Sequence, residues 1–240
     1  DLTDTTNLTI EGSYSANEWT AMHGGAPLEG SILSNPNGDY AKSFNPAGDD
    51  SYTERDSKDL NIRLTEAITD RIDARFSYSY VHNTADWAEY VPFGLDEDNY
   101  RSLDRLIFVG RDTYKKDHEV ILDLTGEFDT GNVTHNFIVG LNYRDSDLSR
   151  PNQLHFAAPI DLFNPEYTAM NLTTDSMLRD RTLLQEDEVL AGFIQDRVQV
   201  TDELQLLAGL RYTDAEQSQV TINHLAGNSR AEDSLSVSNW

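Results

Sequence analysis

Histidine and carboxylate side chains are the residues of this chain most able to perform chemistry, and their spacing supports no metal site. The histidine–glutamate pair at 118–119 is not followed by the second histidine of a His-Glu-x-x-His motif. The acidic run 96–98 lacks the glycine and the distal glutamate of a calcium-binding loop. No pair has the spacing of metal ligands among His23, His82, His118, His135, His155 and His224.

Nucleophilic and cofactor-dependent catalysis lack their usual motifs. The 240-residue chain has no cysteine, no Gly-x-Ser-x-Gly elbow, no phosphate-binding loop and no dinucleotide fingerprint. Paired carboxylates are common, but 42 acidic residues make chance pairs inevitable. We therefore predict no catalytic residue, no metal and no bound cofactor. The formal charge of −24 also argues against a nucleic-acid partner, because phosphate binding requires clustered lysine and arginine.

The elements that carry these residues are seven stretches in which apolar and polar side chains alternate. In the stretch 71–82, Phe76, Tyr78 and Tyr80 fall on one side, and charged or hydroxyl side chains fall on the other. Side chains of a β-strand point to opposite faces with period two, so each stretch predicts a strand with one apolar and one polar face. The seven stretches are 6–14, 58–66, 71–82, 118–128, 135–144, 188–200 and 204–213.

These strands have the length of membrane-crossing strands. Each can supply the roughly 9–11 residues that a tilted strand needs to cross hydrocarbon, whereas no run approaches the roughly 18 apolar residues of a membrane helix. Asp196 shares the parity of the apolar residues Ile194 and Val198, and we interpret it as an interfacial residue or a local bulge. The arginines of the strands all lie on the polar face, where pairing with acids of neighbouring strands is expected. They are Arg63, Arg75, Arg144, Arg197 and Arg211.

The connections between the stretches are of two kinds. Short turns rich in Asp, Asn, Gly and Thr lie at 68–70, 129–132 and 201–203. Long segments lie at 15–57, 83–113 and 146–185, all on the opposite side, and a further segment begins near residue 219 and does not return. This alternation predicts an all-β fold, an antiparallel transmembrane β-barrel with short periplasmic turns and long extracellular loops. Because seven strands cannot close such a barrel, we expect a fragment.

The hairpin at 186–216 resembles one typical of TonB-dependent receptors. The similarity lies in an aromatic residue, one further residue and Gln-Asp, then a Thr-Asp turn, and Leu-x-Leu-x-x-Gly-x-Arg-Tyr, here from Phe193 to Tyr212. Two loop segments resemble ferrichrome-type siderophore receptors in particular. They are the stretch 27–38, ending in Asn-Pro-Asn-Gly, and the stretch 159–167, Pro-Ile-Asp-Leu-Phe-Asn-Pro-Glu-Tyr.

The resemblance implies a barrel of about 22 strands in the bacterial outer membrane. An N-terminal plug fills such a barrel, which imports a ferric chelate with energy transmitted by TonB. Residues 1–240 would then be part of the barrel domain, without the plug, the TonB-contacting segment and the remaining strands. The expected partners are a ferric chelate (a hydroxamate being one candidate), the plug, TonB through the missing N-terminal region, and outer-membrane lipid and lipopolysaccharide.

In the resembled receptors, aromatic side chains above the plug contact the siderophore. The candidates of this kind lie in the long polar segments, and the alternative is that they pack the loops against one another. The ligand-binding candidates are Trp87, Tyr90, Phe93 and Tyr100, together with Trp19, Tyr40 and Phe44. The inward arginines would pair with lumenal acids or donate hydrogen bonds to the plug.

Two other functions fit an outer-membrane barrel. A passive, porin-like channel would have a constricting loop and no plug. A surface adhesin, or an attachment protein for phage or bacteriocins, would use its long loops to bind macromolecules and would need no TonB-contacting segment. The sequence that precedes Asp1 in the full-length protein would separate these alternatives.

Overall fold

In the computed structural model, one antiparallel sheet contains all the strands. The described residues are 4–20, 35–39, 41, 44–48, 50–96, 98–201 and 203–239. Nine strands lie in the sheet, eight of them in the order β1-β2-β3-β4-β5-β7-β8-β9, while the two-residue β6 pairs with β4. The strands are β1 (Thr6–Trp19), β2 (Tyr52–Thr69), β3 (Ile72–Leu95), β4 (Ser102–Thr130), β5 (Val133–Phe156), β6 (Ile160–Asp161), β7 (Met177–Thr201), β8 (Leu204–Asn223) and β9 (Ser229–Asn239).

All seven predicted stretches lie in strands, apart from Arg71 in the turn before β3, and the strands are much longer than predicted. The segment 83–113 is mostly strand, because β3 continues to Leu95 and β4 begins at Ser102. The segment 146–185 likewise contains the end of β5 and the start of β7. Beyond the apolar stretch neither face is uniformly apolar, so the alternation fades while the backbone hydrogen bonds between strands continue. The prediction of a long loop is therefore wrong for 83–113, whereas in 146–185 a shorter loop, 157–176, remains between β5 and β7.

The segment after residue 219 also returns to the sheet, contrary to the prediction. A short 3₁₀ helix, η2 (His224–Ala226), and two residues with positive φ, Gly227 and Asn228, reverse the chain. Strand β9 then pairs with β8 from Ser229 to Asn239. Most side chains of β9 are small or charged, so this strand lacks the alternation of apolar and polar residues that predicted the other strands.

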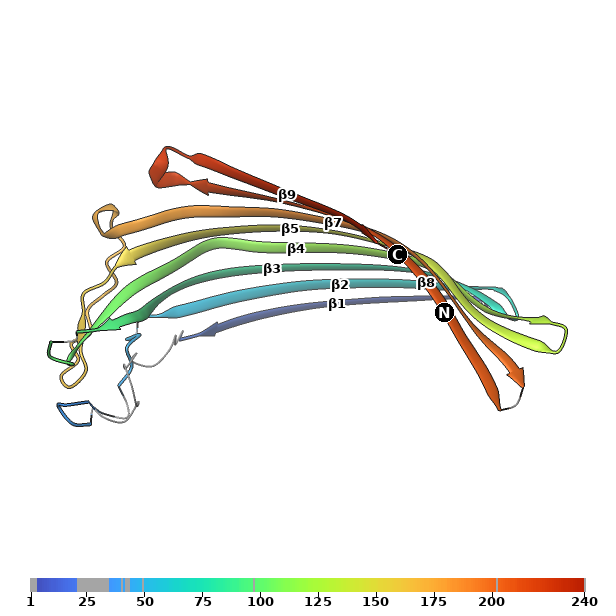
Figure 1. The fold of residues 1–240 in the computed structure, drawn as a ribbon, viewed down its shortest axis with the longest axis horizontal. Helices are drawn as coiled ribbons and strands as arrows, with labels where there is room; N and C mark the ends of the chain where they lie inside the picture. Colours follow the sequence, from blue (N-terminus) through green and yellow to red (C-terminus); the bar gives the residue numbers. More distant parts are fainter. Residues whose placement is uncertain are drawn as a thin grey trace.

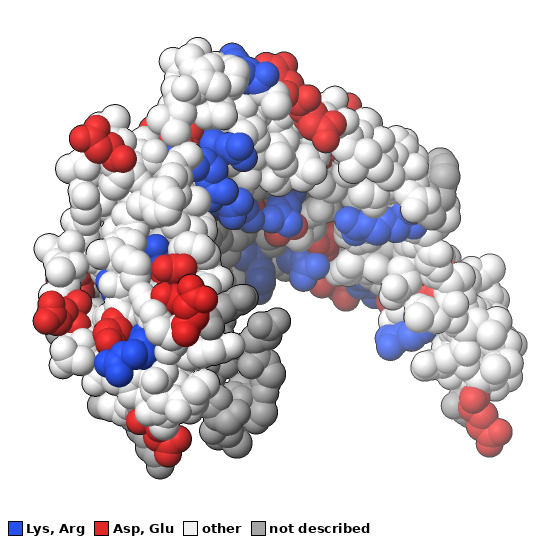
Figure 2. All heavy atoms as spheres, turned by 60° about the vertical axis from the view of Figure 1, so that its left-hand side comes forward, with Lys and Arg blue, Asp and Glu red and all other residues white. Residues whose placement is uncertain are grey.

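The sheet forms a long curved wall. Figure 1 shows the strands running side by side along the longest axis, with the short turns at one end and the loops at the other. Seen more nearly end-on, the wall is an arch, and many of its lysine and arginine side chains lie along the hollow beneath it (Figure 2). No helix within the described residues is long and apolar enough to cross a membrane.

The two faces of the wall have the chemistry that the alternation predicts. In the register, Leu64, Phe76 and Leu122 stand directly opposite one another on successive strands and so share the outward face. Leu122 and Leu206 are 49% and 55% exposed, so they do not form the core of a compact soluble protein. Asp196 lies on the same face, with its Oδ2 2.6 Å from His135 Nδ1. The β5–β7 pairing is regular at this position, without a bulge. It is therefore a paired residue near the short-turn end.

The buried core lies at the long-loop end rather than in the middle of the wall. We call the described residues of 35–51 and 157–176 the loop cap, because they pack on the extended β3–β4 hairpin. One cluster centres on Tyr90, Ile107 and Val109, against which Tyr52 and Met170 pack. A second cluster joins Leu103 of β4 to Ile160 and Leu162 of the cap. The cap ends in the short 3₁₀ helix η1 (Thr174–Ser176), and β7 begins directly after it.

Candidate functional site

The inward face of the wall carries a ladder of charged and polar side chains. Arg75 of β3 donates two hydrogen bonds to Asp123 Oδ2 of β4, at 3.0 and 2.8 Å. Only 1% of the Asp123 side chain is exposed. Arg144 of β5 similarly pairs with Asp117 of β4, with Nη2 and Oδ1 2.8 Å apart. These cross-strand pairs connect neighbouring strands on the inward face of the wall.

The remaining predicted inward arginines have other surroundings. Arg211 lies 6.0 Å above the ring of Phe193 and donates to Thr213 Oγ1. Phe193 in turn covers Gly140, where a Cβ atom would lie 2.6 Å from the ring. Among the described residues, neither Arg63 nor Arg197 makes an ion pair. Both therefore remain available to a group that enters the hollow.

A bulge in β4 decides which residues of the long β3–β4 hairpin face inward. Between Tyr114 and Val109, β4 has one residue more than β5 opposite, so the parity of its side chains changes there. Asp112 adopts a φ of 53° in the bulge, and its N–H donates to Asp86 Oδ1 at 2.6 Å. Beyond the bulge the even-numbered residues of β4 continue the inward face, and the odd-numbered ones continue the outward face.

This change of parity separates the aromatic candidates of β3. Trp87 faces inward, and its ring lies over Gly110, whose Cβ would be only 2.2 Å from Cζ2. Tyr90 faces the other way, is 3% exposed, and donates its hydroxyl hydrogen to the carbonyl oxygen of Thr168. Trp87 therefore lies where a ligand in the hollow could reach it, whereas Tyr90 is occupied in packing the loop cap.

The other predicted aromatic residues have varied positions. Phe93 is 54% exposed near the end of β3, and Tyr100 lies in the β3–β4 turn with a φ of 55°. Trp19 ends β1 on the inward face and is 45% exposed. Phe44 packs against the second cluster of the cap. Tyr40 lies outside the described residues. The structure thus does not gather the seven candidates into one site, and their ligand-binding roles stay predictions.

A better-defined surface lies around Trp87 on the inward face. Phe108 of β4 is opposite Leu154 of β5, which is opposite Arg179 of β7. The Arg179 guanidinium lies 5.8 Å from the Phe108 ring, and its Nη2 donates to Asn152 Oδ1 at 2.7 Å. Arg150 and Arg181 have the same inward parity on β5 and β7. We call this surface the mouth wall: Trp87, Leu106, Phe108, Arg150, Asn152, Leu154, Arg179 and Arg181.

The loop cap is fixed on the outward side of the same hairpin by a buried arginine. Arg105 is 2% exposed and lies 4.3 Å above the ring of Tyr90. Its Nη1 donates to the carbonyl oxygen of Pro46, and its Nε and Nη2 donate to that of Ala158. Burial lowers the pKa of Arg105 and raises the pKa of Tyr90. One side chain thereby joins three chain segments.

Of the two loop segments that resemble siderophore receptors, residues 27–34 lie outside the described residues, and 35–38 and 159–167 make contacts with the β3–β4 turn. Asn37 Nδ2 donates to the carbonyl oxygen of Asn99, and Asn35 Nδ2 to that of Tyr100, which attaches the Asn-Pro-Asn-Gly segment to the β3–β4 turn. Asp161 accepts the N–H groups of Phe163 and Asn164 and pairs with Arg101 at 2.9 Å. These backbone donors, with Arg101, hold the pKa of Asp161 below its ordinary value.

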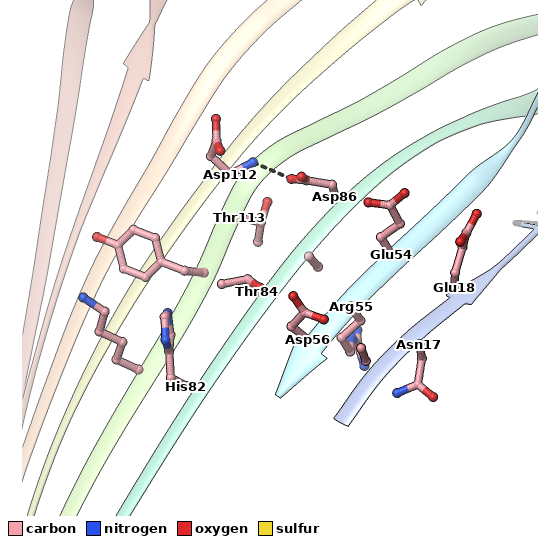
Figure 3. A pocket seen from close by; sticks show the side chains of 14 residues that line it. Asn17, Glu18, Glu54, Arg55, Asp56, His82, Thr84, Asp86, Asp112 and Thr113 are labelled. Carbon is pink, nitrogen blue, oxygen red and sulfur yellow. Dashed lines mark hydrogen bonds between the residues drawn. The ribbon is translucent and has the colours of Figure 1, made fainter. Parts of the chain in front are cut away.

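A large hollow lies on the outward face. Its volume is about 760 Å³, and Figure 3 shows acidic side chains of four strands around it, among them Glu18, Glu54 and Asp86. Arg55, His82 and Lys116 are also part of its lining. Because most of the lining has the parity of the apolar face, this hollow does not open into the interior of the arch. In the part of the chain that the structure describes, no three His, Asp or Glu side chains gather as metal ligands.

Comparison with known proteins shows the family to which this sheet belongs. The family model described as "TonB dependent receptor-like, beta-barrel" matches residues 1–240. The chain belongs to this family. The ferrioxamine B receptor of Salmonella typhimurium strain SL1344 is 23% identical over 227 residues, which are 93% of this chain and 31% of that receptor. The chain thus spans about a third of the length of this relative.

Solved siderophore receptors share the fold. The open form of the ferric-catecholate import receptor Fiu from E. coli K12 matches with a TM-score of 0.81 at 15% identity, over 98% of this chain and 40% of Fiu. The siderophore receptor PiuA from Acinetobacter baumannii matches with a TM-score of 0.68 at 15% identity, over 98% of this chain and 37% of PiuA. The family is one of receptors and transporters rather than enzymes.

Sequence reasoning missed several residues that matter in this TonB-dependent receptor barrel. Phe108, Arg105 and Arg179 fell in segments that were expected to be loops, so their faces could not be assigned. The signal was present in the alternation of Leu103, Ile107 and Val109, but the bulge at Asp112 shifts it out of phase with the membrane-spanning part of β4. The pairing of β4 with β3 and β5 is needed to determine which face of the sheet each of these residues occupies.

Proposed function

We propose that this TonB-dependent receptor barrel is part of an outer-membrane transporter that binds a ferric siderophore at its long-loop end. Energy transmitted by TonB would then drive the siderophore inward. The observation that carries the proposal is the two-faced wall: exposed leucine and valine outward, and arginine–carboxylate pairs inward. Such a wall separates lipid from a polar interior that can admit a plug and a large ligand.

The partners follow from this role. A plug would occupy the hollow of the arch, where Arg63 and Arg197 offer unpaired guanidinium groups. TonB would act through a segment outside residues 1–240. Lipid and the outer leaflet would cover the apolar face, and iron would arrive as chelated cargo, with no resident cofactor and no covalent chemistry.

Uptake by the full-length receptor tests the proposal. We expect a strain that expresses it to accumulate radioactive iron from a ferric siderophore, and to lose this uptake when TonB is deleted. Uptake that persists without TonB would indicate a passive channel instead. Tight binding of cobalamin or an oligosaccharide, with no binding of any ferric chelate, would remove the iron assignment. Binding only to a phage or bacteriocin would favour an attachment protein.

A further inference from the structure

At its long-loop end, beyond Asp187, the β5–β7 hairpin carries a group of arginines on its inward face. Its inward face carries Arg150, Arg179 and Arg181. Several residues nearer the short turns, the outward face of β5, β7 and β8 carries acids, which are Asp145, Asp147, Glu186, Glu188 and Glu216, and the inward face carries Asp187. In a chain with a formal charge of −24, a group of arginines that faces the hollow is a local reversal of the overall sign.

These three arginines have no carboxylate partner among the described residues. Arg150 and Arg181 are exposed. Arg179 is oriented by Asn152 through a single 2.7 Å hydrogen bond, and its Nε is buried without a partner. Guanidinium groups form their strongest hydrogen bonds with anionic oxygens, and two donors on one arginine can bind such a group together. The arginine half of the mouth wall is therefore suited to an anion.

The other half of the mouth wall is aromatic and apolar. Phe108 lies beneath the Arg179 guanidinium, and Leu154 stands between them in the register. Trp87 lies over Gly110, which is two residues from Phe108 on the same face of β4. Aromatic faces of this kind accept flat rings through offset or edge-on contacts. A ligand that spans both halves would combine aromatic groups with negative charge.

We propose that the mouth wall selects a ferric chelate that carries net negative charge and aromatic donor groups, as a catecholate complex does. A neutral hydroxamate complex offers neither feature and would bind more weakly. The inference rests on the proposed function and specifies the ligand class of that site. Arg150, Arg179 and Arg181 would hold the anionic oxygens, while Trp87 and Phe108 would contact the rings.

The experiment compares two probes on the full-length receptor, an anionic ferric tris-catecholate and a neutral ferric trihydroxamate. We expect the anionic chelate to bind more tightly, with an affinity that falls as the salt concentration rises. Arg150→Gln and Arg181→Gln change exposed side chains, so they should not disturb folding. Each should weaken binding of the anionic chelate about tenfold, the loss expected for one charge-assisted hydrogen bond, and should leave the neutral chelate unaffected. Arg230→Gln, an exposed arginine on the outward face of β9, is the matched control and should change neither affinity.

Each alternative result has a distinct meaning. Preference for the neutral chelate, or equal weakening of both chelates by the arginine variants, would overturn the proposed selectivity while leaving siderophore uptake intact. Absence of binding to either chelate would reject the selectivity together with the proposed function. A fall in affinity of the same size in Arg230→Gln would show that the effect is only the change of net charge, and would also overturn the proposal.

Discussion

Arg105 is the residue on which the loop cap most depends. Its guanidinium bonds to carbonyl oxygens in two cap segments and lies over a tyrosine ring, yet it is almost fully buried. A buried cation without a carboxylate partner is costly unless its donors are satisfied, and here backbone carbonyls satisfy them. The cap is thus organised around one charged side chain as well as around apolar contacts.

Replacing Arg105 by methionine should loosen the cap. The substitution removes hydrogen bonds from a charged donor to Pro46 and Ala158, so the free energy of local opening should fall by about 2–3 kcal/mol. Hydrogen exchange of the amides in 157–172 would measure it. Arg101→Gln removes an exposed ion pair with Asp161 and should cost less than about 1 kcal/mol. Unchanged exchange in the Arg105 variant would contradict the assigned role.

His155 makes the cap sensitive to acid. It is 0% exposed, its Nδ1 lies 3.0 Å from Ser176 Oγ, and burial, aided by the positive charge of Arg111, lowers its pKa despite the opposing effects of Thr173 and Asp180. As the pH falls, His155 therefore binds a proton at a higher pH when the cap is open than when it is closed. Stability of the cap should be complete above the ordinary histidine pKa of about 6.5 and should fall as the pH drops below it.

Hydrogen exchange of 157–176 at about pH 7.5 and about pH 5.5 would measure this dependence. The wild-type protein should exchange faster relative to intrinsic rates at the lower pH, and His155→Asn should lose that pH dependence. His224→Asn, at an exposed histidine in η2, should retain it. A pH-independent wild type would rule out His155 as the sensitive group.

Gly110 permits the inward position of the Trp87 ring. A Cβ atom on residue 110 would overlap the ring, with 2.2 Å to Cζ2. Gly110→Ala should therefore destabilise the protein by about 1–3 kcal/mol through overpacking and should shift the Trp87 ring. In a Trp87→Leu background the same change should cost much less. Thermal unfolding of the four proteins gives the coupling, and equal costs in both backgrounds would show that the contact is unimportant.

At the level of elements, the bulge at Asp112 determines which side chains line the mouth. The residue has a φ of 53°, a conformation that glycine tolerates and β-branched residues avoid. Asp112→Gly should thus be nearly neutral, whereas Asp112→Val should cost about 1–2 kcal/mol and loosen the hairpin beyond it. Unfolding of the two variants in urea would compare them. A valine variant as stable as the glycine variant would mean that the bulge is not strained.

The same element shows how far the sequence could predict the fold. Residues such as Phe76, Leu122 and Leu206 alternate with polar neighbours, and the strands that carry them were predicted correctly from this period of two. Beyond these apolar stretches the alternation ends. The segment 83–113, which was predicted to be a loop, forms the outer part of the β3–β4 hairpin. Tyr90 was assigned to ligand contact because no local pattern reports the burial that distant Thr168 and Met170 impose.

At the level of the whole molecule, the wall is one part of a larger closed structure. Its first and last strands, β1 and β9, each pair with one neighbour only among the described residues. Exposed strand edges and exposed leucines would favour association, so the neighbouring strands of the full barrel are expected to cover both edges. The proposed uptake would therefore be a property of the complete receptor, with the wall and the loop cap as parts of it.

Site-directed spin labelling along β4 tests the two-faced wall most directly, and residues 1–240 contain no cysteine to interfere. Labels would replace Ile121, Leu122, Leu124 and Thr125 in the full-length receptor in lipid bilayers. The account predicts frequent collisions with lipid-dissolved oxygen at Leu122 and Leu124, which share the outward face, and few at Ile121 and Thr125. Equal collision rates at all four positions, or more at Ile121 than at Leu122, would contradict it.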